Sequence, residues 1–271
     1  MNGASREALA AARERLDALT DNTAADAAQL ADELAAVTAL LDREVSLRRV
    51  LTDPAQAGEA KAELVQRLLG TQVGGATADL VAGMVRSRWS QSRDLVDALE
   101  ELASTADFTA AQKSGTLDDV EDELFRFGRI VSSSTELRAA LTDRKAGTSA
   151  KKELLRTLLG GKAKPTTERL VTRLVTAPRG RSLEAGLESL SKLAAERRDR
   201  MVAVVTSAVP LSDTQKQRLG AALAKLYGRR MHLNLDVDPE VLGGIRVQVG
   251  DEVINGSLAD RIADAERRMA S

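Results

Sequence analysis

The chain has no cysteine, a single histidine and very few aromatic side chains, and each of these absences excludes a kind of chemistry. Without cysteine, its 271 residues can form no disulfide, no thiolate nucleophile and no cysteine-based zinc site. His232 alone cannot complete a typical zinc site, and no Ser-His-Asp triad is persuasive with so few parts. Aromatic residues are only 2% of the chain, so the core must be built from leucine, valine and alanine. We therefore expect no enzyme activity, no metal and no cofactor.

A net charge of one sign and long apolar runs are also lacking. Lys and Arg number 39 and Asp and Glu 40, whereas a dedicated nucleic-acid binder usually carries a basic excess. We interpret the basic stretches Arg86–Arg93 and Ala177–Ser182 as solvated helix ends, with nucleic-acid contact as the alternative. Ala195–Arg200 is interpreted as a solvated hinge helix that could instead meet acidic residues of a partner. No run approaches the length of a membrane span, and the N-terminus lacks a signal-peptide pattern, so we expect membrane association only through a complex.

What the sequence does contain is an internal duplication. Leu47–Gly70 recurs 90 residues later as Leu137–Gly160, without a gap and with 12 of 24 positions identical. At the same offset Ala31–Leu41 aligns with Glu121–Val131, and Leu80–Val85 with Leu170–Val175. The repeat covers about one domain length, which predicts two copies of a helical bundle rather than solenoid units.

Each copy has the periodicity of short helices. Leu34, Val37 and Leu41 recur every three or four residues, as on one face of a helix. Asp53 is a plausible N-cap with Pro54 at the first helical position, and Gly70 is predicted to end the next helix through its access to positive φ. We predict bundles of about five or six helices each, with domains at residues 1–104, 105–200 and 201–271.

From Met201 onward the pattern changes to β-rich. Residues 201–209 and 231–237 are predicted strands, and Ser212 with Gln215 matches a capping box for the helix between them, whose apolar face is Leu219, Leu223 and Leu226. Residues 244–249 and 252–254 are predicted to form a hairpin. The expected turn and cap residues are Asp238, Pro239, Gly243, Gly244, Gly250, Asp251, Asn255, Gly256 and Ser257. The fold class is therefore mainly α with a small α+β C-terminal domain.

The closing passage "VDPEVLGGIRVQVGDEVINGSLADRI" resembles the C-terminal signature of the delta subunit of F-type ATP synthase, called OSCP in mitochondria. The resemblance is carried by the D-P, G-G, G-D and I-N-G-S elements in order, supported by Val205–Gln215 and by the second repeat, and covers about residues 113–271. The usual family member has one N-terminal bundle, so the duplicated bundle is similar to the long actinobacterial form. The family's opening helix is missing or degraded at Ala106–Gly115.

The resemblance implies a non-catalytic subunit of the peripheral stalk, on the cytoplasmic face of the cell membrane. Its partners would be N-terminal helices of alpha subunits, held in grooves of the bundles, and the b subunit, held by the C-terminal domain. The candidate partner-binding residues are Leu9, Leu16, Leu95, Leu99, Leu102, Leu124, Leu183 and Leu187, each with a core position as its alternative. The other function considered is a helical adaptor or nucleic-acid-binding regulator built on duplicated bundles.

Overall fold

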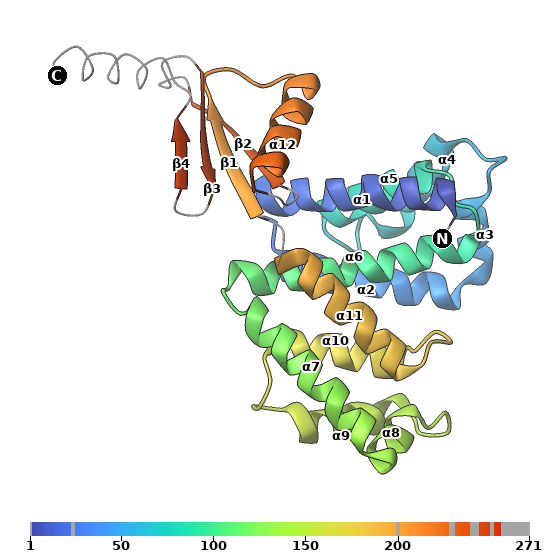
Figure 1. The fold of residues 1–271 in the computed structure, drawn as a ribbon. Coiled ribbons are helices and arrows are strands. Elements are labelled where there is room, and N and C mark those ends of the chain that lie inside the picture. The colour runs from blue at the N-terminus through green and yellow to red at the C-terminus, as the bar shows by residue number, and fades with distance from the viewer. Residues whose placement is uncertain are drawn as a thin grey trace, which may run out of the picture. The chain divides into compact units, whose positions relative to one another are not determined.

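The computed structural model describes residues 2–22, 25–198, 201–227, 231–238, 244–249 and 252–255 (Figure 1). The chain separates into two compact units, Met1–Arg197 and Arg198–Ser271. The described part is mainly helical with one small sheet in the second unit, which confirms the predicted fold class. None of its helices is long and apolar enough to cross a membrane.

The first unit consists of two helical bundles that share one helix. The first bundle contains α1 (Gly3–Asn22), α2 (Ala27–Arg43), α3 (Val45–Thr52), α4 (Gly58–Leu69), α5 (Gly75–Arg86) and the first part of α6 (Ser92–Lys113). The second contains the end of α6, α7 (Leu117–Ser133), α8 (Thr135–Thr142), α9 (Thr148–Leu159), α10 (Pro165–Thr176) and α11 (Leu183–Arg198).

Helix α6 passes from one hydrophobic core into the other. Its buried residues up to Ala106 belong to the first core, and those from Phe108 belong to the second. No glycine or proline interrupts the helix between Ser92 and Lys113, so nothing in the sequence stops it there. The predicted division between residues 104 and 105 falls inside this continuous helix, which serves as the last helix of one bundle and the first of the next.

The duplication extends to individual hydrogen bonds. In the first bundle, the Glu33 carboxylate on α2 accepts a hydrogen bond from Thr77 near the start of α5. In the second, Glu123 on α7 accepts one from Thr167 at 2.5 Å, near the start of α10. Both pairs are 44 residues apart, and the two carboxylates lie 90 residues apart. Each carboxylate therefore stabilises the N-terminus of the facing helix, where peptide N–H groups lack partners.

Two local predictions in the first repeat need correction. Helix α4 begins at Gly58, so Asp53 is not its N-cap; the Asp53 side chain instead accepts a hydrogen bond from the Ala55 amide at 2.9 Å within a turn. Gly70 does end the helix, but its φ is −59°. Glycine is needed there because an added Cβ would lie 2.5 Å from the Gln66 carbonyl oxygen.

The second unit is a four-stranded mixed sheet with one helix. Its elements are β1 (Met201–Ser207), α12 (Asp213–Tyr227), β2 (Met231–Val237), β3 (Ile245–Val249) and β4 (Glu252–Asn255), with strand order β2-β1-β3-β4. Strands β1 and β2 are parallel, with α12 connecting them, and β3 pairs antiparallel with both β1 and β4. Val205, Leu223, Val247 and Val249 form the buried centre.

The predictions for this unit have mixed outcomes. The capping box is confirmed: the Ser212 amide donates to Gln215 Oε1 at 2.8 Å, and the Gln215 amide donates to Ser212 Oγ at 3.3 Å. Leu226 is 66% exposed, so its assignment to the apolar face of α12 is wrong; Tyr227 packs against the core instead. Gly244 has the positive φ, +90°, that favours glycine.

The predicted hairpin is confirmed by the pairing of Val249 with Glu252. Asp238 follows β2 and its amide donates to the Ser207 carbonyl at 3.0 Å, while Asn255 is the last residue of β4. The remaining predicted turn and cap residues lie outside the described residues: Pro239, Gly243, Gly250, Asp251, Gly256 and Ser257. The side chain of His232 lies outside them as well.

Candidate functional site

The eight leucines predicted to bind partners all lie in the two hydrophobic cores. None is more than 9% exposed: Leu9, Leu16, Leu95, Leu99 and Leu102 are in the first core, and Leu124, Leu183 and Leu187 in the second. They stabilise the bundles by removing apolar surface from water. Leu124 and Leu187 also line a surface groove between α7 and α11. Partner binding by these leucines stays a prediction.

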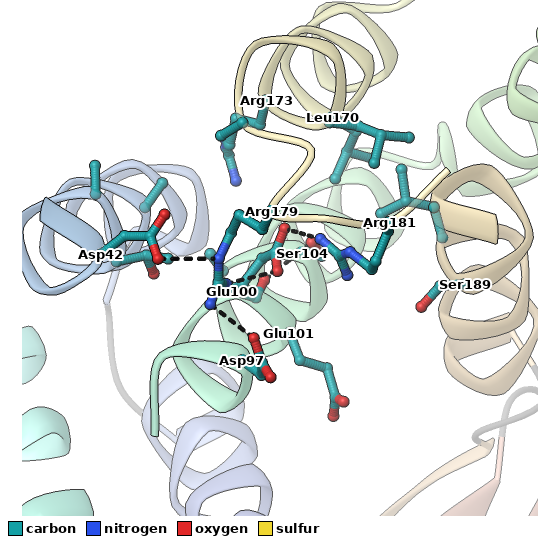
Figure 2. A pocket seen from close by; sticks show the side chains of 18 of the residues that line it. Asp42, Asp97, Glu100, Glu101, Ser104, Leu170, Arg173, Arg179, Arg181 and Ser189 are labelled. Atoms are coloured by element: carbon teal, nitrogen blue, oxygen red, sulfur yellow. Dashed lines mark hydrogen bonds and ion pairs between the residues drawn. The ribbon is translucent and has the colours of Figure 1, made fainter. Parts of the chain in front are cut away.

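The most elaborate polar arrangement lies where the two bundles meet. Helices α2 and α6 of the first bundle face α10, α11 and the loop between them, and together they enclose a cavity of about 500 Å³ (Figure 2). Leucines from α10 and α11 supply apolar lining, while aspartate, glutamate and arginine side chains supply the polar part. The charged side chains pair across the boundary between the bundles, so the junction is held by ion pairs as well as by packing.

Arg179 is the centre of this junction. Its side chain is only 4% exposed, and Figure 2 shows it surrounded by three carboxylates of the first bundle. It lies 2.6 Å from Asp97, 2.8 Å from Glu100 and 3.5 Å from Asp42. It also donates to the Val96 carbonyl at 3.3 Å. Several charge-assisted hydrogen bonds on one planar guanidinium fix its orientation.

The loop between α10 and α11 positions Arg179 through its backbone. Arg179 has φ +51° and Gly180 has φ +82°, so two successive residues adopt the left-handed conformation. That conformation is unfavourable for a residue with a Cβ, and the ion pairs of the side chain stabilise it here. Arg93 on α6 donates to the Arg179 carbonyl at 2.6 Å. Arg181, which lies in the same loop as Arg179, pairs with Glu100 on α6.

A second charged cluster surrounds Asp107 on α6, between the two cores. Its side chain is fully buried and lies 2.7 Å from Arg169 and 2.6 Å from Arg173, both on α10. Arg173 also pairs with Asp32 of α2 at 3.4 Å. Burial raises the pKa of the Asp107 carboxyl above its ordinary value, and the attraction of Arg173 and Arg169 only partly opposes this rise.

A third contact joins the end of α11 to the first bundle. Arg197 lies 3.0 Å from Asp17 of α1, both side chains being 5% exposed, and donates to Gln112 of α6 at 2.6 Å. Interpreting residues 195–200 as a solvated hinge is therefore wrong for Arg197. Interpreting Ala177–Ser182 as a solvated helix end is likewise wrong for Arg179, whose side chain is buried. Both arginines are buried because another segment of the chain supplies carboxylates for them.

Nothing in the sequences of Ala177–Ser182 and Ala195–Arg200 alone distinguishes a buried arginine from a solvated one. The sequence feature that could have indicated the junction is the set of acidic residues on α6. Asp94, Asp97, Glu100 and Glu101 recur at helical spacing on α6, beside the leucine stripe of the same helix. Asp107 stands between the buried residues Ala106 and Phe108, a position that predicts a partner for the charge.

The junction has the chemistry of a mechanical connection. Arg169, Arg173, Arg179, Arg181 and Arg197 each face a carboxylate. Among the described residues, no group of three or more His, Cys, Asp or Glu side chains could hold a metal ion. Removing one member of a buried ion pair costs far more than removing an exposed one. The arrangement therefore resists separation of the bundles.

Comparisons with known proteins agree with the resemblance of the closing passage. The sequence model of a family described as "ATP synthase delta (OSCP) subunit" matches residues 103–269, which begins within α6. A protein of Streptomyces coelicolor called "ATP synthase subunit delta" is 84% identical over 271 residues, covering 100% of this chain and 99% of that protein. A protein of Thermobifida fusca with the same name is 50% identical over 270 residues, covering 100% of both chains.

Among solved structures, a chain from the mitochondrial ATP synthase hexamer of Toxoplasma gondii is 22% identical. It covers 62% of this chain and 95% of that chain, with a TM-score of 0.27. At that score the likeness supports no argument about the fold.

Proposed function

Because the chain belongs to the ATP synthase delta (OSCP) subunit family, we propose that its bundles bind N-terminal helices of the alpha subunits and that its C-terminal unit binds the b subunit. Its function is that of a stator subunit of the F1Fo ATP synthase. In this role it links the catalytic head to the membrane-anchored stalk and resists the torque of the rotor. We propose that the chain has three domains, residues 1–104, 105–200 and 201–271, and that α6 belongs to both of the first two.

The single observation that carries the proposal is the construction of the junction. A stator must transmit force between its bundles without slip. One continuous helix, α6, contributes to both cores, and Arg179 joins them through three carboxylates. Since packed interiors deform little, a force applied to one bundle reaches the other.

The subunit itself catalyses nothing in this proposal. No residue constellation suited to nucleophilic or acid–base catalysis was found in the sequence, and the titratable side chains of the junction are used in ion pairs. We place the protein on the cytoplasmic face of the cell membrane, attached through its complex. The helices in the described ranges include none that could cross the bilayer.

In the first bundle, the proposed binding site for an alpha helix is a groove between α1 and α5. Small residues line it, including Ala8 and Ala11 on α1, Gly83 on α5 and Ser87 directly after α5. Small side chains let a partner helix approach closely, and Arg15 at the same groove offers a positive charge to it. Deleting residues 1–104 would cut α6, so this groove is better tested by filling it with Gly83→Leu.

In the C-terminal unit, the proposed b-binding surface is the face of the sheet opposite its core. Val205 of β1 is buried, so its neighbour Val204 points to the other face and is 36% exposed. Val204 pairs with Gln248, which pairs with Val253, and Val253 is 47% exposed. Two exposed valines, which flank Gln248 on one face of the sheet, give an apolar surface for the end of a stalk helix.

The experiment is affinity purification of the tagged full-length chain from solubilised membranes. We expect alpha, beta and b subunits to copurify with it. Val204→Asp with Val253→Asp is expected to lose b and keep alpha, because the charge would be buried in the b interface. Absence of alpha, beta and b from the wild-type eluate contradicts the proposal. A mobility shift with nucleic acid at physiological salt would instead support the adaptor alternative.

A further inference from the structure

The cavity at the junction of the two bundles is large for a protein interior, which normally leaves few voids bigger than a water molecule. Its volume of about 500 Å³ lies within the range of about 300–1,000 Å³ that is typical of small-molecule sites (Figure 2). Some of its lining residues are buried and others are exposed: Ala103, Leu174 and Leu190 are buried, and Ala39, Arg93 and Ser189 are exposed. A small molecule can therefore enter from solvent and reach a buried interior.

The apolar part of the lining suits an aliphatic ligand. It consists of alanine and leucine side chains from both bundles: Ala39 and Ala103 from the first, and Leu170, Leu174, Leu190 and Leu193 from the second. No phenylalanine, tyrosine or tryptophan is among the described residues that line the cavity, so a flat ring such as a nucleobase has no aromatic partner on which to stack. A hydrocarbon chain gains free energy from burial against leucine without such a partner.

The carboxylates of the lining are already paired, which disfavours a ligand with a positive charge. Three of the four surround Arg179, and the fourth, Glu101, accepts a hydrogen bond from Arg13 at 2.7 Å. A cationic group would have to displace one of these arginines and leave it without its carboxylate. Since such displacement costs free energy, the acidic side chains serve the junction and not a ligand.

One arginine of the lining has no carboxylate partner. Arg93 donates to the Arg179 carbonyl, but it forms no ion pair with the residues that the structure describes. The leucine stripes of α6 and α11 align at an offset of 88 residues, which makes Arg93 the counterpart of Arg181, and Arg181 does pair with Glu100. A guanidinium presents its N–H donors in a geometry that fits a carboxylate. An anionic head therefore suits the rim of the cavity.

We propose that the junction cavity is a binding site for an aliphatic molecule with an anionic head, of the chemical class of a medium-chain fatty acid. The hydrocarbon chain lies against Leu170, Leu174 and Leu190, and Arg93 at the rim holds the carboxylate. The cavity shares no lining residue with the α1/α5 groove, so the site does not depend on the proposed function. Because the ligand contacts both bundles and binds only the folded chain, it stabilises the junction.

The test is isothermal titration calorimetry of the full-length chain with sodium octanoate, at concentrations below those at which octanoate forms micelles. Octanol has the same hydrocarbon body without the charge, and adenosine monophosphate combines an anionic group with a flat ring. We expect octanoate to bind at least about threefold more tightly than octanol, which is the scale of one exposed ion pair. Octanoate that does not bind the wild type, octanol that binds as tightly, or displacement of octanoate by adenosine monophosphate overturns the proposal.

Two pairs of variants distinguish the cavity from nonspecific binding. Ala39→Leu narrows the cavity from α2, and Ala36→Leu is its matched control, because Ala36 is exposed on the same helix and does not line the cavity. Leucine is a good helix former, so both variants should fold. Arg93→Gln removes the charge at the rim, and Arg67→Gln, at an exposed position on α4, is its control.

We expect Ala39→Leu to weaken octanoate binding at least about tenfold, because the added side chain occupies the space of the ligand. Arg93→Gln should weaken it about threefold and should bind octanoate and octanol equally. The two controls should stay within about twofold of the wild type. Unchanged affinity of both Ala39→Leu and Arg93→Gln, or an equal loss in Ala36→Leu, overturns the proposal when circular dichroism shows that the variants are folded.

A second measurement locates the ligand in the cavity. The chain lacks cysteine, so Ser189→Cys places a single thiol in the cavity lining, and Ser149→Cys places one on α9, outside it. Saturating octanoate should slow alkylation of Ser189→Cys and leave the rate for Ser149→Cys unchanged. Equal rates for Ser189→Cys with and without octanoate overturn the assignment of the site to this cavity.

Discussion

Replacing Arg179 with methionine should uncouple the two bundles more than any other single change at the junction. Methionine keeps the length of the aliphatic stem and removes the guanidinium. Asp97, Glu100 and Asp42 then face one another without a positive charge between them. Because the backbone of the loop keeps its conformation partly through these pairs, the left-handed φ of residue 179 also loses its support.

The expected loss of unfolding free energy is about 3 kcal/mol. Removing one partner of a buried ion pair costs ~3–5 kcal/mol when the other charges stay buried. The lower end applies because the side chains of Asp97, Asp42 and Glu100 are 42%, 36% and 25% exposed and can regain water. The remaining packing of α6 in both cores is unchanged by the substitution.

Urea unfolding of the full-length chain measures this loss. Trp89 is the only tryptophan and is buried in the first bundle, so its fluorescence reports on that bundle, while far-ultraviolet circular dichroism reports on all helices. In the variant, the two signals should change at different urea concentrations. Arg156→Met is the control, because its partner Glu153 is exposed, and it should leave the midpoint unchanged. A loss below about 1 kcal/mol with coincident transitions refutes the coupling role of Arg179.

Four further substitutions test other parts of the account. The raised pKa of Asp107 contributes stability that is fully present below its ordinary pKa of 3.8 and is lost as pH rises through the folded-state pKa. Urea unfolding at a series of pH values should therefore show the free energy of unfolding of Asp107→Asn rising relative to that of the wild type toward neutral pH. A relative rise toward acid pH contradicts this. Glu33→Gln and Glu123→Gln should each cost about 0.5–1 kcal/mol in urea unfolding, because both weaken the same kind of helix-end contact; a loss in one copy only would show that the copies are not equivalent. Gly186→Ala should cost about 1–3 kcal/mol despite the better helix propensity of alanine, since the added Cβ overlaps Leu174 Cδ1; an unchanged melting temperature contradicts that overlap.

Local patterns predicted the elements well because their causes are local. The capping box at Ser212 and Gln215 depends on residues three apart, and the strand pairing of β3 with β4 depends on a short connection. Asp53 was misassigned because an aspartate can accept a hydrogen bond in a turn as readily as at a helix start. Leu226 follows Leu223 at helical spacing, but Tyr227, four residues after Leu223, packs against the core in its place.

The junction could not be predicted, because its residues are brought together by tertiary structure. Arg179 and Asp42 are 137 residues apart in the chain, and nothing near either residue specifies the other. The duplication predicted two similar bundles but not that α6 joins them, since the repeat offset says nothing about a break between copies.

The most direct test of the stator role uses inverted membrane vesicles from which this chain has been removed together with the catalytic head. Adding the head with the purified full-length chain should restore proton pumping driven by ATP hydrolysis, whereas adding the head alone should give hydrolysis without pumping. Equal pumping with and without the chain would contradict the account.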